Sequence, residues 1–234
     1  MAQPLPIDAA LPELLDALRA RRRAVLEAPP GAGKTTRVPL ALHAAGLAEG
    51  RIVMLEPRRI AARAAAERMA ATLGERTGER VGYRIRGETR VSSATRIEVV
   101  TEGVLTRLLQ ADPELTGIAA VLFDEVHERS IHTDLGLALA LEVHETLRPD
   151  LRILAMSATL DTARFAALFG GAPVIESAGR LHPVETRRLD RPRGGPRPSR
   201  GVFERAAADL VLRALLETDD APGGDLLVFL PGAG

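Results

Sequence analysis

Several residue types are missing or scarce in this chain of 234 residues, and each absence excludes something. There is no cysteine, which excludes disulfides and thiolate metal sites and fits a reducing compartment, so we expect a cytoplasmic protein. Aromatic residues make up 3% of the sequence, so the core must be aliphatic. No apolar run is long enough to span a bilayer, and the N-terminus lacks a signal-peptide pattern, so we expect no membrane partner.

Neither sign of charge is in excess, because Lys+Arg and Asp+Glu both number 31. A neutral chain argues against one large basic face but allows a local phosphate-binding groove. Among the basic residues lysine is nearly absent, and Lys34 is the only one. Arginine carries a broad planar fork, whereas lysine carries a compact charge on a thin stem. A loop wrapped tightly around a phosphate has room for lysine, so Lys34 is the first candidate functional residue.

Lys34 lies in the segment Ala-Pro-Pro-Gly-Ala-Gly-Lys-Thr, a permissive P-loop pattern with alanine in place of the first glycine. In such a loop, backbone N–H groups surround the β-phosphate of ATP, Lys34 bridges the β- and γ-phosphates, and the Thr35 hydroxyl binds Mg²⁺. The alternative is a Gly/Pro-rich turn that only caps a helix. The residues predicted to hold the nucleotide phosphates are Pro30, Gly31, Ala32, Gly33, Lys34, Thr35 and Thr36.

Two acids follow another apolar segment, in Leu-Phe-Asp-Glu-Val-His over residues 122–127. Asp124 would hold the metal, usually through water, and Glu125 would polarise the attacking water. The alternative is a pair of solvated acids at the end of a strand. His127 is a candidate general base or coupling residue, and on an extended backbone it would point the same way as Glu125.

Short apolar runs alternate with helical patterns, which predicts an α/β fold: a parallel sheet with helices on both faces. The expected strands are residues 24–28, 52–55, 96–101, 119–123, 151–156 and 173–176, and the expected helices are 11–22, 35–45, 60–73, 102–110, 134–147 and 161–169. Ser157 and Thr159 follow one of these strands, and hydroxyls there face the ligand crevice of a parallel sheet. Capping of the next helix is the alternative role for Thr159.

The character of the sequence changes after His182, so we expect one domain over residues 1–182 and a second over 183–234. The second part contains a candidate strand at 183–189, an Arg/Pro/Gly-rich loop at 190–200, a helix at 202–216 and a strand at 225–230. This order of elements indicates the incomplete start of a second α/β domain.

Taken together, the motifs resemble those of the first RecA-like lobe of a DEAH-type superfamily 2 helicase, over about residues 10–190. The matching segments are residues 55–59 (motif Ia), 81–86 (the segment after it), 101–103 (motif Ib), 124–127 (motif II) and 157–159 (motif III). The resemblance implies a P-loop NTPase with a RecA-like fold, ATP and Mg²⁺ as cofactors, and single-stranded nucleic acid as the partner, with RNA favoured over DNA.

The resemblance also implies roles for single residues. Arg68 matches the position at which DEAH helicases place an arginine against the adenine ring, and Ser157 and Thr159 would couple hydrolysis to movement of the lobes. Contacts to the sugar-phosphate backbone of a strand carry no sequence information, so binding should be salt-sensitive and sequence-tolerant. The residues to which the resemblance assigns a contact with the strand backbone are Arg58, Arg59, Thr101, Glu102 and Gly103.

One family motif does not occur in these 234 residues: Gln-x-x-Gly-Arg-x-Gly-Arg, which supplies arginine fingers from the second lobe. Arginine fingers accelerate P-loop hydrolysis by about 10³–10⁵. We therefore expect this chain to bind Mg-ATP weakly, to hydrolyse it slowly and not to unwind duplexes. The alternatives are a non-catalytic nucleotide-binding fragment and a DNA-directed P-loop ATPase; a kinase is disfavoured because it has no use for a strand-binding edge.

Overall fold

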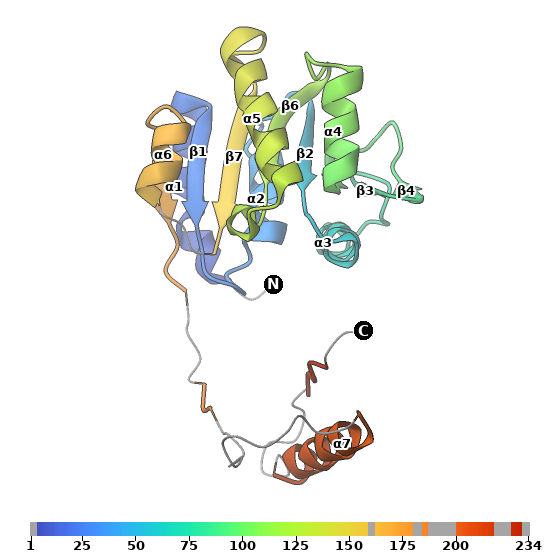
Figure 1. The fold of residues 1–234 in the computed structure, drawn as a ribbon. Coiled ribbons are helices and arrows are strands. Elements are labelled where there is room, and N and C mark those ends of the chain that lie inside the picture. The colour runs from blue at the N-terminus through green and yellow to red at the C-terminus, as the bar shows by residue number, and fades with distance from the viewer. Residues whose placement is uncertain (1–3, 159–161, 180–183, 187–199, 218–225, 231–234) are drawn as a thin grey trace. The chain divides into compact units, whose positions relative to one another are not determined.

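The computed structural model describes residues 4–158, 162–179, 184–186, 200–217 and 226–230 (Figure 1). The chain divides into two compact units, residues 1–182 and 183–234. Each is described by itself below. Among the described residues, no helix is both long enough and apolar enough to cross a membrane.

The first unit is built on an eight-stranded sheet with the order β4-β3-β5-β2-β6-β7-β1-β8. Neighbouring strands run parallel except β3 and β4, which form an antiparallel pair at one edge. The strands are β1 (Arg23–Glu27), β2 (Arg51–Leu55), β3 (Val81–Ile85), β4 (Glu88–Arg90), β5 (Ile97–Val100), β6 (Ile118–Phe123), β7 (Arg152–Ser157) and β8 (Val174–Glu176).

Helices cover both faces of this sheet, which confirms the predicted α/β class (Figure 1). The helices are η1 (Pro6–Ala9), α1 (Leu11–Arg21), α2 (Lys34–Ala44), α3 (Arg59–Thr72), α4 (Glu102–Ala111), η2 (Val126–Glu128), α5 (Ile131–Thr146), α6 (Thr162–Leu168) and, in the second unit, α7 (Arg200–Glu217). One apolar cluster joins the sheet to α1, α2 and α3, and the other joins it to α4, α5 and α6. Each central strand is therefore buried on both faces, which is why it appears in the sequence as a continuous apolar run.

The main elements lie close to their predicted bounds, and the differences have local causes. Helix α5 begins three residues earlier than expected, because the Ser130 hydroxyl accepts a hydrogen bond from the His132 N–H (3.3 Å) and caps the helix. The hairpin of β3 and β4 was not predicted as strands. A Cβ on Gly82 would lie 2.2 Å from the Arg90 carbonyl oxygen, so this glycine, which weakens a strand signal, is required for the close pairing.

The second unit matches the predicted order only in part. Helix α7 is present where residues 202–216 predicted a helix. The predicted strand at 225–230 is wrong over the described residues 226–230, which form no strand and are exposed, and residues 184–186 of the candidate strand at 183–189 also form none. An apolar run becomes a strand only where a neighbouring strand takes up its backbone hydrogen bonds. The loop at 190–200 lies outside the described residues apart from Arg200.

Candidate nucleotide site and strand-binding edge

The strands bring the predicted motifs to one edge of the sheet. The P-loop follows β1, the two acids follow β6, and Ser157 ends β7, the strand that pairs with both. The segments with Arg58 and Thr101 follow β2 and β5, which are neighbours on the other side of β6. Because carboxyl ends of parallel strands share one edge, all five segments border the crevice where ligands bind in open α/β sheets.

The P-loop has the backbone that a phosphate loop requires. Gly31 and Gly33 have φ of +78° and +95°, values that side-chain-bearing residues rarely adopt. Pro30 and Gly31 are exposed, Ala32 is buried, and Gly33 is the N-cap of α2 without any side chain to cap it. The first turn of α2 is therefore left with N–H groups and a positive dipole that suit an anion.

Two side-chain contacts join the P-loop to the acids after β6. Lys34 Nζ lies 3.0 Å from Glu125 Oε1, and the Thr35 hydroxyl donates to Asp124 Oδ2 at 2.6 Å. Lys34 is 4% exposed and Asp124 is fully buried, so both charges are largely removed from water. The structure thus brings together the four residues predicted for phosphate, metal and water.

The metal prediction agrees with the donor set. Thr35 and Asp124 offer a hydroxyl and a carboxylate side by side, which are the hard oxygen ligands that Mg²⁺ takes. Among the described residues no group of three His, Cys, Asp or Glu side chains forms a complete metal cage. Mg²⁺ ordinarily binds through one or two protein groups together with phosphate oxygens and water, so a two-residue donor set fits it.

The buried acids repel one another. Burial raises the pKa of Asp124 to about 6, although Lys34 and the Thr35 hydroxyl oppose the shift. Burial also raises the pKa of Glu56 to about 7, with the charge on Asp124 as the next cause. We assigned no role to Glu56 from the sequence; the available signal was an acid directly after an apolar strand at the same edge as the P-loop. A divalent cation would relieve this excess of negative charge.

His127 meets Glu125, but not by the predicted route. The backbone is not extended there: Glu125 has φ of +54° and residues 126–128 form the turn η2. His127 Nδ1 nevertheless lies 3.3 Å from Glu125 Oε2, and the Ala158 N–H donates to the same nitrogen at 3.4 Å. His127 therefore links the acids after β6 to the segment after β7. Ser157 is buried at the end of β7, and Thr159 lies outside the described residues.

The residues with a predicted strand contact lie at the starts of two helices. Arg58 is the N-cap of α3 and Arg59 its first residue, and both are exposed. Thr101 is the buried N-cap of α4, Gly103 is exposed, and the Glu102 carboxylate accepts a hydrogen bond from the Thr133 hydroxyl (2.9 Å). We call the starts of α3 and α4 the strand-binding edge. Arg68 is exposed further along α3, and its adenine contact stays a prediction.

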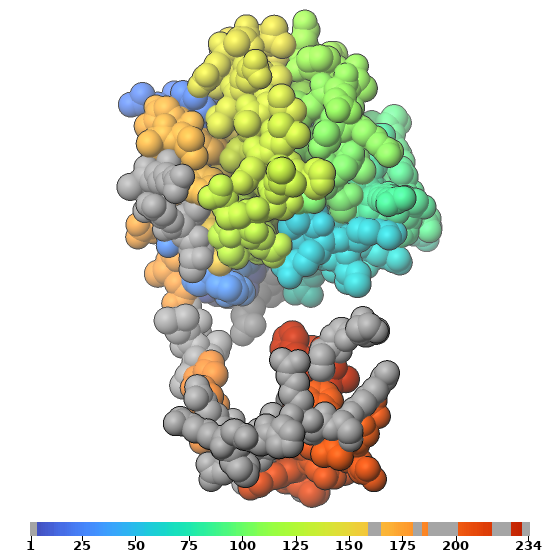
Figure 2. All heavy atoms as spheres, viewed as in Figure 1, coloured from blue at the N-terminus to red at the C-terminus, as the bar shows by residue number. Residues whose placement is uncertain are grey.

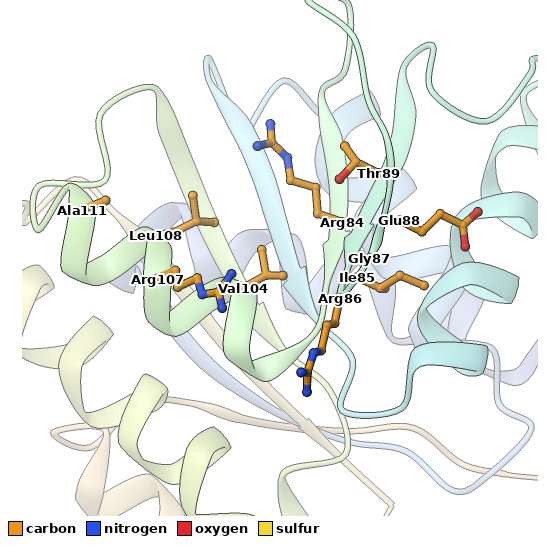
Figure 3. Close-up of a pocket in the computed structure, with 10 residues that line it drawn as sticks. All are labelled: Arg84, Ile85, Arg86, Gly87, Glu88, Thr89, Val104, Arg107, Leu108 and Ala111. Carbon is orange, nitrogen blue, oxygen red and sulfur yellow. The ribbon is translucent and has the colours of Figure 1, made fainter.

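A cavity of about 660 Å³ lies beside this edge and not at the P-loop. It is open to solvent and is lined by the hairpin of β3 and β4 on one side and by α4 on the other (Figure 3). Arg84 and Arg86 of the hairpin and Val104, Arg107 and Leu108 of α4 are among its lining residues. The cavity therefore adjoins the helix that begins at Glu102 and is separate from the nucleotide site.

These features define a P-loop nucleotide site on a parallel α/β sheet, paired with two acids after a neighbouring strand. The chain belongs to the DEAD/DEAH box helicase family, which matches residues 8–166. The family assignment confirms the resemblance drawn from the motifs.

Three curated proteins show how the chain relates to that family. It is 49% identical to the ATP-dependent RNA helicase HrpB of Escherichia coli strain K12 over 98% of its length, 37% identical to the ATP-dependent RNA helicase DHX30 of Gallus gallus over 99%, and 34% identical to the ATP-dependent RNA helicase HrpA of Escherichia coli strain K12 over 97%. The chain spans only 27%, 20% and 17% of the lengths of these relatives.

The fold is likewise similar to a solved structure. The crystal structure of the Escherichia coli DEAH/RHA helicase HrpB matches with a TM-score of 0.83 and 48% identity, covering 98% of this chain and 28% of that one. A second crystal structure, of the E. coli DExH-box NTPase HrpB, matches with a TM-score of 0.79 at the same identity. The predicted RecA-like fold is confirmed by this likeness.

Proposed function

We propose that this chain is the ATP-binding motor lobe of an ATP-dependent RNA helicase, which couples hydrolysis of Mg-ATP to movement along single-stranded RNA. The observation that carries the proposal is the pair of contacts Lys34–Glu125 and Thr35–Asp124, which unites the two halves of a nucleotide site. The relatives are named ATP-dependent RNA helicases, which supports RNA as the substrate class.

Each of the four residues has a separate task in hydrolysis. Lys34 holds the β- and γ-phosphates, and Thr35 and Asp124 hold Mg²⁺, which neutralises the charge of the phosphate oxygens when it is bound. Glu125 orients and polarises the attacking water. Because Lys34 and Glu125 are paired, a γ-phosphate that takes Lys34 leaves the Glu125 carboxylate available for that water. His127, whose Nδ1 accepts from the Ala158 N–H, lies beside Glu125 and connects it to the segment after β7.

The strand-binding edge holds RNA through its sugar-phosphate backbone. Arg58 and Arg59 supply exposed positive charge at the start of α3, and Glu102 and Gly103 supply backbone N–H groups at the start of α4, where Thr101 is the N-cap. Ser157 and Thr159 transmit the state of the nucleotide to the following segments, and Arg68 stacks against the adenine ring. We further propose that residues 183–234 begin a second RecA-like lobe.

Mg-ATP binding tests the nucleotide half of this proposal. Anisotropy of a fluorescent ATP analogue should show Mg²⁺-dependent binding to the chain, and Lys34→Ala should reduce the affinity by at least about tenfold, since a charge-assisted contact to phosphate is lost. Arg37→Ala is the matched control, because Arg37 lies one turn further on α2 and pairs with Asp8 (3.6 Å). Equal effects of the two substitutions would contradict the site.

Strand binding tests the RNA half. Labelled oligouridine should bind at low salt, and its affinity should fall steeply as salt is added, because the contacts are to phosphates. Binding that is equally tight for oligothymidine would favour a DNA-directed or unspecific ATPase. We expect hydrolysis by the 234 residues to be slow and duplexes not to be unwound, because no Gln-x-x-Gly-Arg-x-Gly-Arg motif occurs in them. RNA-stimulated turnover at several per second would overturn that expectation.

A further inference from the structure

Four side chains of the loop after β6 contact three different segments of the lobe. Three of these contacts serve the nucleotide site or its coupling: Asp124 accepts from Thr35, Glu125 pairs with Lys34, and His127 accepts from the Ala158 N–H. The fourth residue is Glu128, which reaches the start of α3 instead. Glu128 has no part in the hydrolysis derived above, and no role was predicted for it.

Glu128 contacts the arginine that is proposed to bind the strand. Arg58 Nη2 lies 3.3 Å from Glu128 Oε1, and the side chains are 64% and 37% exposed. Figure 2 shows α3 (cyan) and the segment after β6 (yellow-green) meeting on one face of the molecule. Arg58 is also anchored from within, because its N–H donates to Glu56 Oε1 at 3.5 Å. Arg58 Nε also lies 3.9 Å from Glu56 Oε1, so the exposed guanidinium has two carboxylate partners, Glu56 and Glu128.

A phosphate at Arg58 and the Glu128 carboxylate exclude each other electrostatically. A phosphate oxygen that accepts a hydrogen bond from the Arg58 guanidinium would lie beside the Glu128 carboxylate. The two negative charges would then repel one another. Arg58 can therefore satisfy a strand fully only when Glu128 moves away. The free energy needed to separate Glu128 from Arg58 is subtracted from the free energy of strand binding. A stronger Arg58–Glu128 pair therefore means a lower affinity for the strand.

Glu128 is joined to Glu125, the proposed catalytic acid, by one short turn, so movement of Glu128 can change the position of Glu125. The Glu128 N–H donates to the Glu125 carbonyl oxygen (2.9 Å), so the two residues close the same turn. The turn is bounded by two non-glycine residues with positive φ, Glu125 at +54° and Arg129 at +53°. Such residues are held in a costly conformation by surrounding contacts, so loss of one contact can change it.

We propose that Glu128 is a positioning residue that links the strand-binding edge to the catalytic loop: Glu128 and a backbone phosphate of RNA compete for Arg58, and release of Glu128 resets the turn that carries Glu125. The inference rests on the proposed function, because it requires Arg58 to bind the strand. Linkage is reciprocal for binding free energies, so nucleotide binding must change the affinity for RNA through the same turn.

The test measures binding of fluorescein-labelled oligouridine to the 234-residue chain at low salt, by anisotropy, for single and double variants. Glu128→Gln should tighten binding by about two- to fivefold, the range of one exposed ion pair, because Arg58 loses the nearer of its two carboxylate partners and keeps Glu56 (3.9 Å). Arg58→Ala should weaken binding, and in that background Glu128→Gln should have little effect. Glu145→Gln is the matched control: it makes the same chemical change at an exposed carboxylate that pairs with Arg23 (3.0 Å) and not with Arg58 or the turn after β6.

A second measurement, the effect of a bound ATP analogue on RNA affinity, distinguishes a positioning role of Glu128 from a simple effect of its negative charge on RNA binding. Saturating Mg²⁺ with a non-hydrolysable ATP analogue should change the RNA affinity of the unmodified chain and of Glu145→Gln by the same factor, and that factor should approach one in Glu128→Gln. Glu128→Ala provides a second variant, and thermal melts followed by circular dichroism verify that each folds.

The outcomes distinguish the inference from the function on which it rests. If Arg58→Ala leaves RNA binding unchanged, the strand contact of Arg58 is wrong and the proposed edge fails. If Arg58→Ala weakens binding but Glu128→Gln behaves as Glu145→Gln does in both backgrounds, the strand contact stands and the competition alone is refuted.

Discussion

Lys34 Nζ lies 3.0 Å from Glu125 Oε1, so the cation proposed for the phosphates is paired with the carboxylate proposed for the water. Both groups are largely buried, with side-chain exposures of 5% and 16%, and each therefore restrains the other. Nucleotide binding must break this pair before hydrolysis can begin. A substitution of Glu125 should therefore change the affinity for ATP and the rate of hydrolysis in opposite directions.

Glu125→Gln should tighten ATP binding while it removes hydrolysis. The neutral amide competes less for Lys34, so affinity for a fluorescent ATP analogue should rise about threefold or more, as for loss of a single ion pair. Single-turnover phosphate release should fall by about 10²–10⁴, the usual contribution of a general base. Glu145→Gln is the control, since it makes the same chemical change at an exposed carboxylate that pairs with Arg23 (3.0 Å) and has no contact with the phosphate site or with the turn after β6. Turnover that survives Glu125→Gln would show that another group activates the water.

Thr35→Ala should remove most of the Mg²⁺ dependence of ATP binding. The hydroxyl now donates to Asp124 at 2.6 Å and is positioned to give its oxygen to the metal. We expect the ratio of affinities with Mg²⁺ and with EDTA to fall by about tenfold, a loss comparable to that of one well-placed polar contact. Thr35→Ser keeps the hydroxyl and should keep the ratio. An unchanged ratio in Thr35→Ala would place the metal elsewhere.

Local patterns in the sequence predicted the central strands and the motif residues, because both depend on short-range chemistry. Buried parallel strands appear as apolar runs, and the P-loop requires its glycines and lysine in consecutive positions. The hairpin of β3 and β4 could not be predicted in this way. Its pairing depends on Gly82 lying against the Arg90 carbonyl oxygen, and a glycine in isolation weakens the strand signal.

Contacts between motifs were only partly predictable. That Thr35 meets Asp124 depends on β7 lying between β1 and β6, which is a property of the strand order and not of either motif. The partners of Glu56 and Glu128 depend likewise on β2 lying beside β6. Glu56 and Glu128 both lie in recognisable motifs. No local sequence pattern predicts that Glu56 is buried or that Glu128 pairs with Arg58.

Gly82→Ala should destabilise the first unit by about 2–4 kcal/mol, the range for a substitution that forces backbone apart in a packed region. The added Cβ would lie 2.2 Å from a backbone oxygen of β4, and backbone cannot rotate away as a side chain can. Gly87→Ala, in the turn of the same hairpin, is the matched control. Its Cβ meets nothing within 4 Å, so only the positive φ of +83° is strained, at about 1 kcal/mol. Urea denaturation measures both, and equal losses would contradict the close pairing.

Stability without metal or nucleotide should fall as the pH rises from about 5 to about 7, because of Glu56. Its pKa is raised from 4.5 to about 7, chiefly by burial. Between these values the folded chain keeps a proton that the unfolded chain has lost, so the free energy of unfolding decreases with rising pH. The decrease attributable to Glu56 is up to about 3 kcal/mol and is complete above pH 7. Asp124, with its pKa raised to about 6, adds a fall of the same sign at lower pH.

Glu56→Gln should flatten this profile and leave the chain more stable than the unmodified protein at pH 8, as measured by urea denaturation in EDTA. Asp150→Asn provides a control, because the pKa of Asp150 is shifted in the opposite direction to that of Glu56. Arg148 lowers the pKa of Asp150 to about 2, so the stability that Asp150 contributes is present above its unfolded pKa and is lost only as the pH falls toward 2. Asp150→Asn should therefore alter the acid limb and leave the fall between pH 5 and 7 intact. A fall that persists unchanged in Glu56→Gln would mean that Glu56 is ionised throughout this range, with Arg58 compensating its charge more strongly than burial opposes it.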